Sequence, residues 1–593
     1  MKKYKIDLLM LVFCTYIFFI IINDYLTFFL KDFIIGNYVI SFIITAILFI
    51  IIRKKIKIEA PKINKNDIFI ILLIISLFLI RVAVPDSSFD VLNYHIMNQT
   101  NPFLNNTSFN FFPARWINTF SFPLGDRLFY FFRLISNYRL GIIFNYIVLF
   151  LIYFQTKRVI KKLNFIKNDF IISTISFFAL LTEQIISNAS TYYTDLISIP
   201  LFLELLLILL DKNNFSHYYT LFLASILVSL KLSNAFFILL IGLIYLIQHH
   251  KDIKIRHIII GIIIFIFPLV IYMINNYLQT KNPFFPFYNA IFKSPYLNES
   301  NWIEEYYGPK SLKETLLWPI YVLINPRRAY DTNIYFGRIT YCYISSLILF
   351  FVYLIKCIKN KQTIKEFYRN NRIEIIIVTL YLVLLLLWGK FMMGYIRYAL
   401  ILEVLGWVTF VILIKECLKS KKYVMNVLLF IVSCCLGFQV FSSTNTILFD
   451  SDIISWRYSI LSENWKEKYR LNSKKILSFK KSKTINDIDC IGIADYNLGY
   501  AIMTSKNIPI ISLNESYNND YGKSKYEDFI KKCDNIYTIT TKFTKDRTNQ
   551  YLKEINYEFD DDIKIIDNDF LDSENELLYI KIKKINKQKE EVK

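Results

Sequence analysis

The chain has 593 residues, of which 54% are hydrophobic, and it carries a formal net charge of +21. This composition is too apolar for a water-soluble protein of this size. The charge does not indicate nucleic-acid binding, because the lysine and arginine residues lie in short connections between apolar segments, where they orient a protein in a membrane.

Apolar segments of membrane-spanning length alternate with basic connections over residues 1–441. A helix needs about 20 apolar residues to cross a hydrocarbon core of ~30 Å. Residues 1–23 are expected to be a retained span, since no small-residue cleavage site follows them. About thirteen spans are predicted, at residues 7–23, 33–52, 67–84, 139–156, 169–186, 195–211, 218–230, 233–248, 257–276, 337–356, 373–388, 398–415 and 423–441. The fold class predicted for this part is a polytopic α-helical membrane protein.

The segments 218–230 and 233–248 are short. They are either two half-length helices that flank Lys231 or one bent span. The positive-inside rule favours two crossings, because only then do all the basic connections fall on one side, which is the cytoplasm. The N-terminus is then cytoplasmic, and the loops 85–138 and 277–336 are external, as is the C-terminal region.

The hydrophobic pattern ends after residue 441. Residues 442–475 are expected to form a linker or neck, and residues 476–593 an extracytoplasmic soluble α/β domain, because short apolar strands alternate with helical segments. Cys490 and Cys533 both lie in this domain and could pair. It lacks a glycine-rich phosphate loop, which favours a docking or lid domain without catalysis over a nucleotide site.

Charged groups near membrane depth are expensive and often mark function. The first candidates follow the third span, at Asp86, Asp90 and His95. The next loop interleaves aromatic residues with Arg115, Arg127 and Arg133. We expect it to lie in the membrane interface, with arginine toward headgroups or lipid phosphates. The alternative is that the two acids are solvated loop residues.

Further candidates lie at the external ends of later spans. Glu183 and Asp195 bracket a short turn, although an acid at a helix start also serves as a cap. Lys231 lies between the two short spans, where snorkelling to headgroups is the alternative. Arg397 and Tyr398 begin a late span, and an arginine fork suits phosphate oxygens. The topology places all of these residues on one face, which predicts a single site at the outer membrane surface.

Several ordered motifs resemble the GT-C superfamily of integral-membrane glycosyltransferases, particularly the bacterial family-39 protein mannosyltransferases and lipid A aminoarabinose transferases. The similarity covers roughly residues 65–440. It departs from the family pattern in two ways. Two spans precede the span before the catalytic loop, and the more widely spaced acids Asp86 and Asp90 replace the usual pair of acids in that loop. The matching stretches are FDVLNYHI with Asp90, Tyr94 and His95, STYYTDL with Asp195, LKLSNAFFILL with Lys231, TKNPFFPFYN, and GYIRYALIL with Arg397 and Tyr398.

The resemblance implies transfer of a sugar from a polyprenyl-phosphate donor at the outer face of the bacterial cytoplasmic membrane, in cell-envelope glycan or glycolipid synthesis. Asp90 or Asp86 would take the proton of an acceptor hydroxyl on a glycan, lipid or protein. Lys231 and Arg397, with Tyr398, would bind the lipid phosphate. Tyr94, His95, Glu183 and Asp195 would support the site. No cofactor is certain, and a divalent cation on Asp90, Asp86 and Asp195 is left open.

Two other functions fit parts of the pattern. A flippase or transporter of a lipid-linked saccharide would need a charged cavity through the membrane, and the spans offer few interior charges. A polysaccharide polymerase or ligase would use the same donors, but it would be expected to centre on arginine and histidine in loops.

Overall fold

The computed structural model describes most of residues 4–418 and parts of residues 489–585. The gaps in the first part are 31–32, 83–85, 87, 89, 101–119, 137–138, 212–214, 302–305, 331–336 and 360–362. The described residues of the second part are 489–493, 510–512, 520–521, 524, 531, 533–541, 545–554, 556–565 and 577–585.

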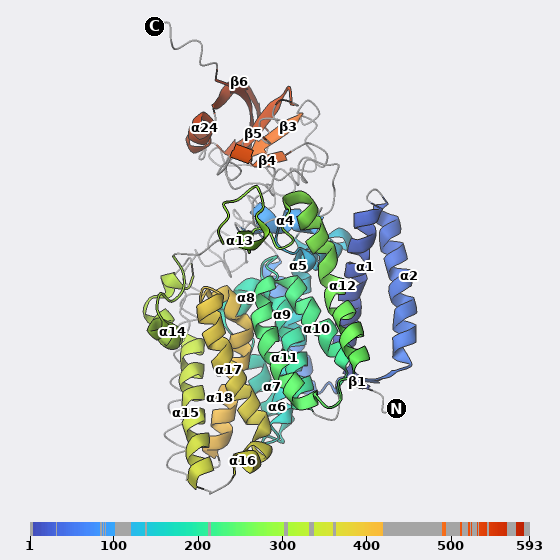
Figure 1. Ribbon diagram of the computed structural model, residues 1–593, viewed down its shortest axis with the longest axis vertical. Coiled ribbons are helices and arrows are strands. Elements are labelled where there is room, and N and C mark those ends of the chain that lie inside the picture. The colour runs from blue at the N-terminus through green and yellow to red at the C-terminus, as the bar shows by residue number, and fades with distance from the viewer. Residues whose placement is uncertain are drawn as a thin grey trace.

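Helices make up the first part, and they run mostly alongside one another as a bundle (Figure 1). They are α1 (Leu8–Phe29), α2 (Ile34–Arg53), α3 (Lys65–Arg81), α4 (Ile96–Thr100), α5 (Leu124–Ile135), α6 (Ile143–Lys162), α7 (Asp169–Phe178), α8 (Glu183–Ala189), α9 (Ser198–Leu210), α10 (His217–Leu230), α11 (Ala235–His249), α12 (Ile255–Thr280), α13 (Asn289–Phe292), α14 (Leu312–Ile324), α15 (Gly337–Lys359), α16 (Ile364–Asn370), α17 (Arg372–Phe391) and α18 (Leu400–Leu418). Single turns that bear on the site are η1 (Val91–His95), η6 (Asp195–Ile197), η7 (Leu232–Asn234) and η9 (Ile396–Ala399).

The membrane spans confirm the predicted fold class. Among the described residues, eight helices are long and apolar enough to cross a membrane, and α7 with α8 would make a ninth. Three further predicted spans are the shorter helices α3, α9 and α10, of 17, 13 and 14 residues. The predicted span 423–441 lies outside the described residues.

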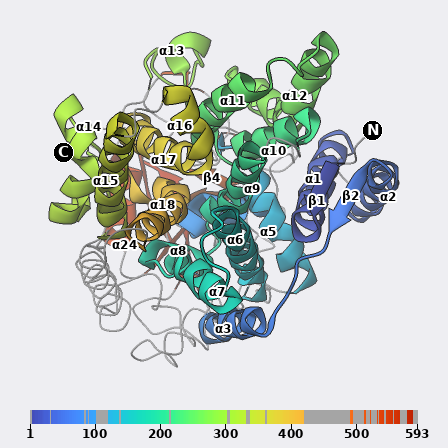
Figure 2. The same cartoon turned by 90° about the horizontal axis from the view of Figure 1, so that it is seen from below.

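The centre of the bundle is formed by α6, α9 and α18 (Figure 2). Every residue of α9 is buried, as expected for a helix that is apolar all round and surrounded by other helices. In contrast, α2 lies at the edge and packs mainly on α1, so much of its apolar surface is exposed, including Ile35 and Phe42. Such a surface suits contact with lipid.

The predicted span 169–186 is divided into two helices. Helix α7 ends at Phe178, and α8 begins at Glu183 at an angle of 78°. The guanidinium of Arg338 donates to the carbonyl oxygens of Phe178, Ala179 and Leu181 at 2.6–3.2 Å. This contact satisfies carbonyls that a continuous helix would use internally, and it therefore stabilises the break.

Helices α10 and α11 form an antiparallel hairpin, as the predicted alternative of two separate helices that flank Lys231 requires. The hydroxyl of Tyr245, near the end of α11, lies 2.8 Å from Nδ1 of His217 at the start of α10. The chain therefore returns to the level at which it started, and Lys231 lies at the apex between the helices.

The C-terminal part contains a five-stranded sheet of the expected α/β type. The strands are β3 (Cys490–Ile493), β4 (Ile510–Ser512), β5 (Ile536–Thr541), β6 (Tyr557–Ile565) and β7 (Leu577–Lys584), and α24 (Lys545–Glu554) connects β5 to β6. Their order is β4-β3-β5-β7-β6, with β3 parallel to β4 and β5, and β7 antiparallel to β5 and β6. The expected linker 442–475 lies outside the described residues.

The sheet lies beyond the end of the bundle that carries α4, α5 and α13, which we call the site end (Figure 1). A contact between the rings of Tyr296 and Tyr521, with centroids 5.0 Å apart, joins the loop after α13 to the C-terminal part. Cys490 and Cys533 form a disulfide between β3 and the segment before β5, as the sequence allowed.

The opposite end carries the N-terminus and a feature that the sequence analysis did not predict. Strand β1 (Tyr4–Asp7) pairs in parallel with β2 (Ile56–Glu59), and Lys5 forms an ion pair with Glu59 at 2.9 Å. The predicted cytoplasmic connection 53–65 is therefore partly a strand. Helices α4, α5 and α13, which belong to the two predicted external loops, and the C-terminal sheet lie at the site end, away from this pair (Figure 1).

Candidate active site

Asp90 lies at the start of a π-helical turn at the site end. In η1 the backbone N–H of Ile96 bonds to the carbonyl of Val91, five residues earlier. Such turns are rare and often occur at functional sites. Both Asp90 and Tyr94 reach the same guanidinium: Nη1 of Arg397 lies 2.5 Å from Oδ2 of Asp90, and Nη2 lies 3.4 Å from the hydroxyl of Tyr94.

Lys231 is placed by the break between α10 and α11. Its backbone is extended, with φ −161° and ψ 123°. Asn234 stabilises the break, since its side-chain amide donates to the carbonyl of Leu227 and the hydroxyl of Ser198, both at 2.9 Å. The ammonium of Lys231 lies 2.6 Å from Oδ1 of Asp195, so it forms an ion pair rather than snorkelling.

Asp195 joins the two cations of the site. Its Oδ2 lies 3.3 Å from Nε of Arg397, while Oδ1 contacts Lys231. The N-cap of η6 is Thr194 and not Asp195, so this carboxylate is used for the ion pairs. We call Asp90, Asp195, Lys231 and Arg397 the ion-pair cluster.

Aromatic rings flank both cations. The ammonium of Lys231 lies 3.6 Å from the centre of the Tyr398 ring, and the guanidinium carbon of Arg397 lies 4.6 Å from the centre of the Tyr193 ring. Cation–π contacts of this kind are stronger where water is excluded. They restrict the positions of both cations.

The second external loop holds the turn that carries Arg397. The indole N–H of Trp318 donates to the carbonyl of Gly394 at 3.1 Å, and the backbone N–H of Ile396 donates to the carbonyl of Ala329 at 2.9 Å. Gly394 has φ +53°, and a Cβ there would lie 2.2 Å from the Trp318 ring. Arg328, from the NPRRAYD stretch, pairs with Glu314 at 3.1 Å and thereby fixes this loop.

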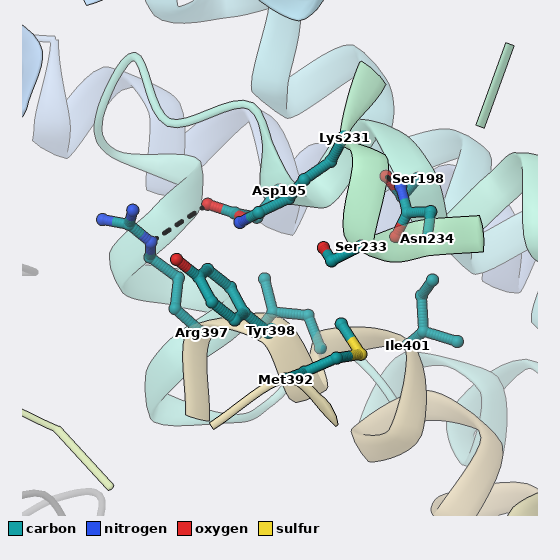
Figure 3. Close-up of a pocket in the computed structure, with 10 residues that line it drawn as sticks. Asp195, Ser198, Lys231, Ser233, Asn234, Met392, Arg397, Tyr398 and Ile401 are labelled. Carbon is teal, nitrogen blue, oxygen red and sulfur yellow. Dashed lines mark hydrogen bonds and ion pairs between the residues drawn. The ribbon is translucent and has the colours of Figure 1, made fainter. Parts of the chain in front are cut away.

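Three members of the ion-pair cluster, Asp195, Lys231 and Arg397, border a small pocket that is partly open to solvent (Figure 3). Asp195, Lys231 and Arg397 lie on one side, and Met392 and Ile401 lie on the other (Figure 3). The pocket therefore combines paired charges with an apolar wall. This arrangement suits a ligand with a charged group next to a hydrocarbon portion.

The two candidate bases have different surroundings. The side chain of Asp90 is 25% exposed. Burial alone would raise the pKa of Asp90, but the charges of Arg397 and His95 and the hydrogen bonds from Arg397 and Tyr94 together lower the pKa below its ordinary value. Asp86 is buried, and its carboxylate accepts the backbone N–H groups of Ser88 and Tyr192, both at 2.9 Å. Burial raises the pKa of Asp86.

Not every predicted residue joins the cluster. Asp86 and Glu183 are absent from the residues that line the pocket, and Glu183 is buried in the first turn of α8. Among the residues that the structure describes, no group of three His, Cys, Asp or Glu side chains could hold a metal ion. The carboxylates of Asp90 and Asp195 are both used by Arg397.

One expectation for the aromatic loop is wrong. Arg127 does not face headgroups: it is buried in α5, and its Nε lies 2.7 Å from Oδ1 of Asp24. The hydroxyl of Tyr272 donates to the other oxygen of Asp24 at 2.8 Å. This pair connects α5 with α1 and α12, so its role is structural. Arg115 lies outside the described residues.

The sequence analysis missed Asp126. Its Oδ1 lies 2.7 Å from Nδ1 of His95, and both side chains are buried. In the sequence this acid directly precedes Arg127. An acid in the first turn of a helix is common because it interacts favourably with the helix dipole, so Asp126 does not stand out as a functional residue. The contact depends on tertiary structure.

The fold and this site define a polytopic helical membrane protein with a buried cluster of paired charges at one end. Two solved structures are similar to it in fold. ArnT from Cupriavidus metallidurans bound to undecaprenyl phosphate has a TM-score of 0.46 at 9% identity, with 86% of this chain and 97% of that chain covered. The apo state of the same ArnT has a TM-score of 0.47 at 8% identity, with the same coverage. No protein-family model and no curated protein matches the sequence.

Proposed function

We propose that the chain is a membrane glycosyltransferase that moves a sugar from a polyprenyl-phosphate donor to an acceptor hydroxyl at the outer face of the cytoplasmic membrane. The observation that carries this proposal is the ion-pair cluster, in which residues from four distant parts of the chain are linked by ion pairs beside a pocket lined by three of them. The motifs that resemble the GT-C superfamily contain all four residues.

The cations suit the phosphate of the donor. Arg397 offers a planar fork of N–H donors, and Lys231 adds a compact charge next to it. As the bond between the anomeric carbon and the phosphate oxygen breaks, negative charge grows on that oxygen. Fixed cations at this position stabilise the transition state more than the ground state. Tyr94 and Tyr398 hold the two cations in place.

The carboxylate suits the acceptor. Asp90 is adjacent to Arg397 and partly exposed, whereas both oxygens of Asp86 accept backbone N–H groups in the interior. We assign Asp90 as the group that takes the proton of the attacking hydroxyl. Displacement in one step needs only this base and a stabilised leaving group.

The depth of the site suits a lipid. Helix α10 has 14 residues, and a rise of 1.5 Å per residue makes it about 21 Å long. The hydrocarbon core is ~30 Å thick, so a helix of this length that begins at one boundary ends roughly 9 Å short of the other, and the apex at Lys231 would lie below the headgroups. A polyprenyl phosphate anchored in the membrane would bring its phosphate to this depth, with its first isoprene units against Met392 and Ile401.

The test is release of undecaprenyl phosphate by the purified protein in nanodiscs, from a panel of undecaprenyl-phosphate hexoses and pentoses. Wild type should release it from at least one donor, and Asp90→Asn should not. Glu59→Gln, in the exposed ion pair at the opposite end, is the matched control and should behave as wild type. Absence of release by wild type from every donor would favour a transporter of lipid-linked saccharides.

A further inference from the structure

Three helices begin at the pocket of the candidate active site. Each continues a single turn without a break in the chain: α9 follows η6, α11 follows η7, and α18 follows η9. All the residues that line the pocket, except Met392, lie in these turns, at their caps or in the first residues of these helices. The helices have 13, 15 and 19 residues. The pocket therefore faces the N-terminal ends of three substantial helices.

These helix ends supply a positive potential that the side chains do not. In the ion-pair cluster, Lys231 and Arg397 are matched by the carboxylates of Asp195 and Asp90, so the formal charges cancel. The N-terminus of a helix corresponds to roughly +0.5 of an elementary charge, because its first backbone N–H groups have no partner within the helix. Three such ends at one pocket are not cancelled by the ion pairs. The pocket therefore favours an anion, and phosphate is a frequent ligand of helix N-termini.

Ser233 provides independent support for a ligand in this pocket. It lies in η7 and lines the pocket, and its Oγ is shielded from water and has no hydrogen-bond partner among the described residues. In Figure 3 the hydroxyl of Ser233 lies on the side of the pocket where Asp195 and Tyr398 are found. Most buried polar side-chain atoms have a partner, and one that has none requires an explanation. A ligand that accepts a hydrogen bond in the pocket provides one.

Ser198 offers a second hydroxyl, from the start of α9. It lines the pocket and is 5% exposed. Its Oγ accepts an N–H of the Asn234 side chain at 2.9 Å. A hydroxyl that accepts one hydrogen bond still has its own proton to donate, and no hydrogen bond from this proton to a described residue is formed. Hydroxyl groups from the starts of two helices can therefore donate to the same ligand.

We infer that Ser233 is a further phosphate-binding residue and that its hydroxyl donates to a non-bridging oxygen of the lipid-linked phosphate; this inference rests on the proposed function. The ligand class is a polyprenyl phosphate, both in the sugar donor and in the product. Ser198 and the N-terminal ends of α9 and α11 complete the set of donors on this side of the pocket. Lys231 and Arg397 contact the remaining phosphate oxygens, and the polyprenyl chain packs on Met392 and Ile401.

The hydroxyl of Ser233 differs from the two cations in what binding costs. Lys231 and Arg397 already have carboxylate partners, so a phosphate gains their contacts only by weakening existing ion pairs. The Oγ of Ser233 gives up no contact with a described residue when it donates to a phosphate. A hydrogen bond to a charged group is stronger than one to a neutral group. A single hydroxyl can therefore contribute measurably to affinity beside two full charges.

Ser233→Ala separates this role from a structural one. The substitution removes only an oxygen that bonds to no described residue, so the Tm should stay the same or rise, whereas a structural hydroxyl would lower it on removal. Ser229→Ala is the matched control. Ser229 lies in the last turn of α10, its buried hydroxyl donates to the carbonyl of Ser225 at 2.9 Å, and it does not line the pocket.

The experiment measures binding in nanodiscs by calorimetric titration, with undecaprenyl phosphate, with the uncharged alcohol undecaprenol, and with inorganic phosphate as a competitor. Ser233→Ala should bind undecaprenyl phosphate about 10-fold more weakly, as expected for loss of one hydrogen bond to a charged group, with no lower Tm. Its binding of undecaprenol should be unchanged, because that ligand has no phosphate. Ser229→Ala should match wild type with every ligand. Inorganic phosphate should compete weakly, because it lacks the chain that packs on Met392 and Ile401.

Wild-type affinity of Ser233→Ala for undecaprenyl phosphate would overturn the inference. Equal weakening of undecaprenol binding, or a lower Tm, would show that the side chain shapes the pocket and would overturn it as well. Competition by inorganic phosphate as strong as that by undecaprenyl phosphate would assign the pocket to free phosphate, against the inference. In each of these cases release of undecaprenyl phosphate from a sugar donor would leave the proposed function intact. Failure of the proposed function has a different signature, which is binding of undecaprenyl phosphate without release from any donor.

Discussion

Arg397 and Asp90 lie 307 positions apart in the sequence and form an ion pair with 2.5 Å between Nη1 and Oδ2. The same guanidinium contacts Asp195, which in turn pairs with Lys231. The cations thus have carboxylate partners in the free protein. A phosphate that enters must compete with these carboxylates, and its binding would release Asp90 from Arg397 for proton transfer.

The first prediction concerns Asp90→Asn. An amide keeps the shape of the side chain but cannot take a proton, so turnover should fall by ~10²–10⁴-fold. Binding of undecaprenyl phosphate should be retained or tightened, because Arg397 loses a competitor. Release assays and equilibrium binding in nanodiscs measure the two effects. Near-normal release from a folded Asp90→Asn protein would remove Asp90 from the role of base.

Asp86→Asn provides the comparison. Asp86 accepts two backbone N–H groups in the interior, and the amide can reproduce only one of these bonds without turning an N–H toward a donor. We expect a loss of stability of about 1–3 kcal/mol, seen as a lower Tm, with a smaller change in turnover than at Asp90. If this variant is as stable as wild type and inactive, Asp86 becomes the better candidate for the base.

The second prediction concerns the phosphate-binding cations. Lys231→Ala and Arg397→Ala should weaken binding of undecaprenyl phosphate by about 10- to 100-fold, since a hydrogen bond to a charged group contributes ~1.5–3 kcal/mol. Turnover should fall as well, because the charge of the phosphate grows in the transition state. Calorimetric titration with undecaprenyl phosphate measures the binding.

Arg397→Lys is the informative control for this prediction. Lysine keeps the charge but lacks the planar fork that contacts Asp90, Asp195 and Tyr94 together. Binding should recover part of the loss seen in Arg397→Ala, whereas turnover should stay low. Unchanged binding in both alanine variants would place the phosphate elsewhere.

The third prediction is a pH dependence of stability. The pKa of Asp90 is lower in the folded protein than its ordinary value of about 3.9, because the charges of Arg397 and His95 and the hydrogen bonds from Arg397 and Tyr94 together outweigh burial. A carboxyl of this kind contributes stability above its unfolded pKa and loses it as the pH falls through the folded value. The difference in Tm between wild type and Asp90→Asn should therefore be constant from about pH 8 to 5 and shrink below about pH 4. A difference that disappears near neutral pH would point to another group.

Much of the candidate site was predictable because charge is sparse at those ends of the apolar helices that the positive-inside rule places outside the cytoplasm. Lys231 and Arg397 stand out in their segments for this reason, and Asp90 and Asp195 are acids at the ends of spans. The sequence did not reveal which residues pair. The contacts of Arg397 with Asp90 and Asp195 depend on how helices distant in sequence pack together.

Other features depend on long-range contacts that leave no local signal. The break between α7 and α8 is stabilised by Arg338, about 160 residues later in the chain, while the segment itself is apolar enough for a continuous helix. The pair of His95 and Asp126 likewise joins η1 to α5. In contrast, the strands of the C-terminal sheet and α24 follow from alternation of apolar and polar runs within the segment, and these were predicted.

The last prediction concerns topology. The hairpin of α10 and α11 returns the chain to the end of the bundle where it started, so the turn at Lys251 should lie on the same side of the membrane as the start of α10. Helix α12 then carries the chain to the loop at Lys293 on the other side. Basic residues cluster in the first of these segments, which the positive-inside rule places in the cytoplasm. Both side chains are exposed. In a background without other reactive thiols, Lys293→Cys should react with a membrane-impermeant maleimide in intact cells, and Lys251→Cys only after permeabilisation. Equal labelling of both in intact cells would contradict a crossing by α12. The reverse pattern would contradict the double crossing and place the ion-pair cluster at the cytoplasmic face, where an externally acting glycosyltransferase has no use for it.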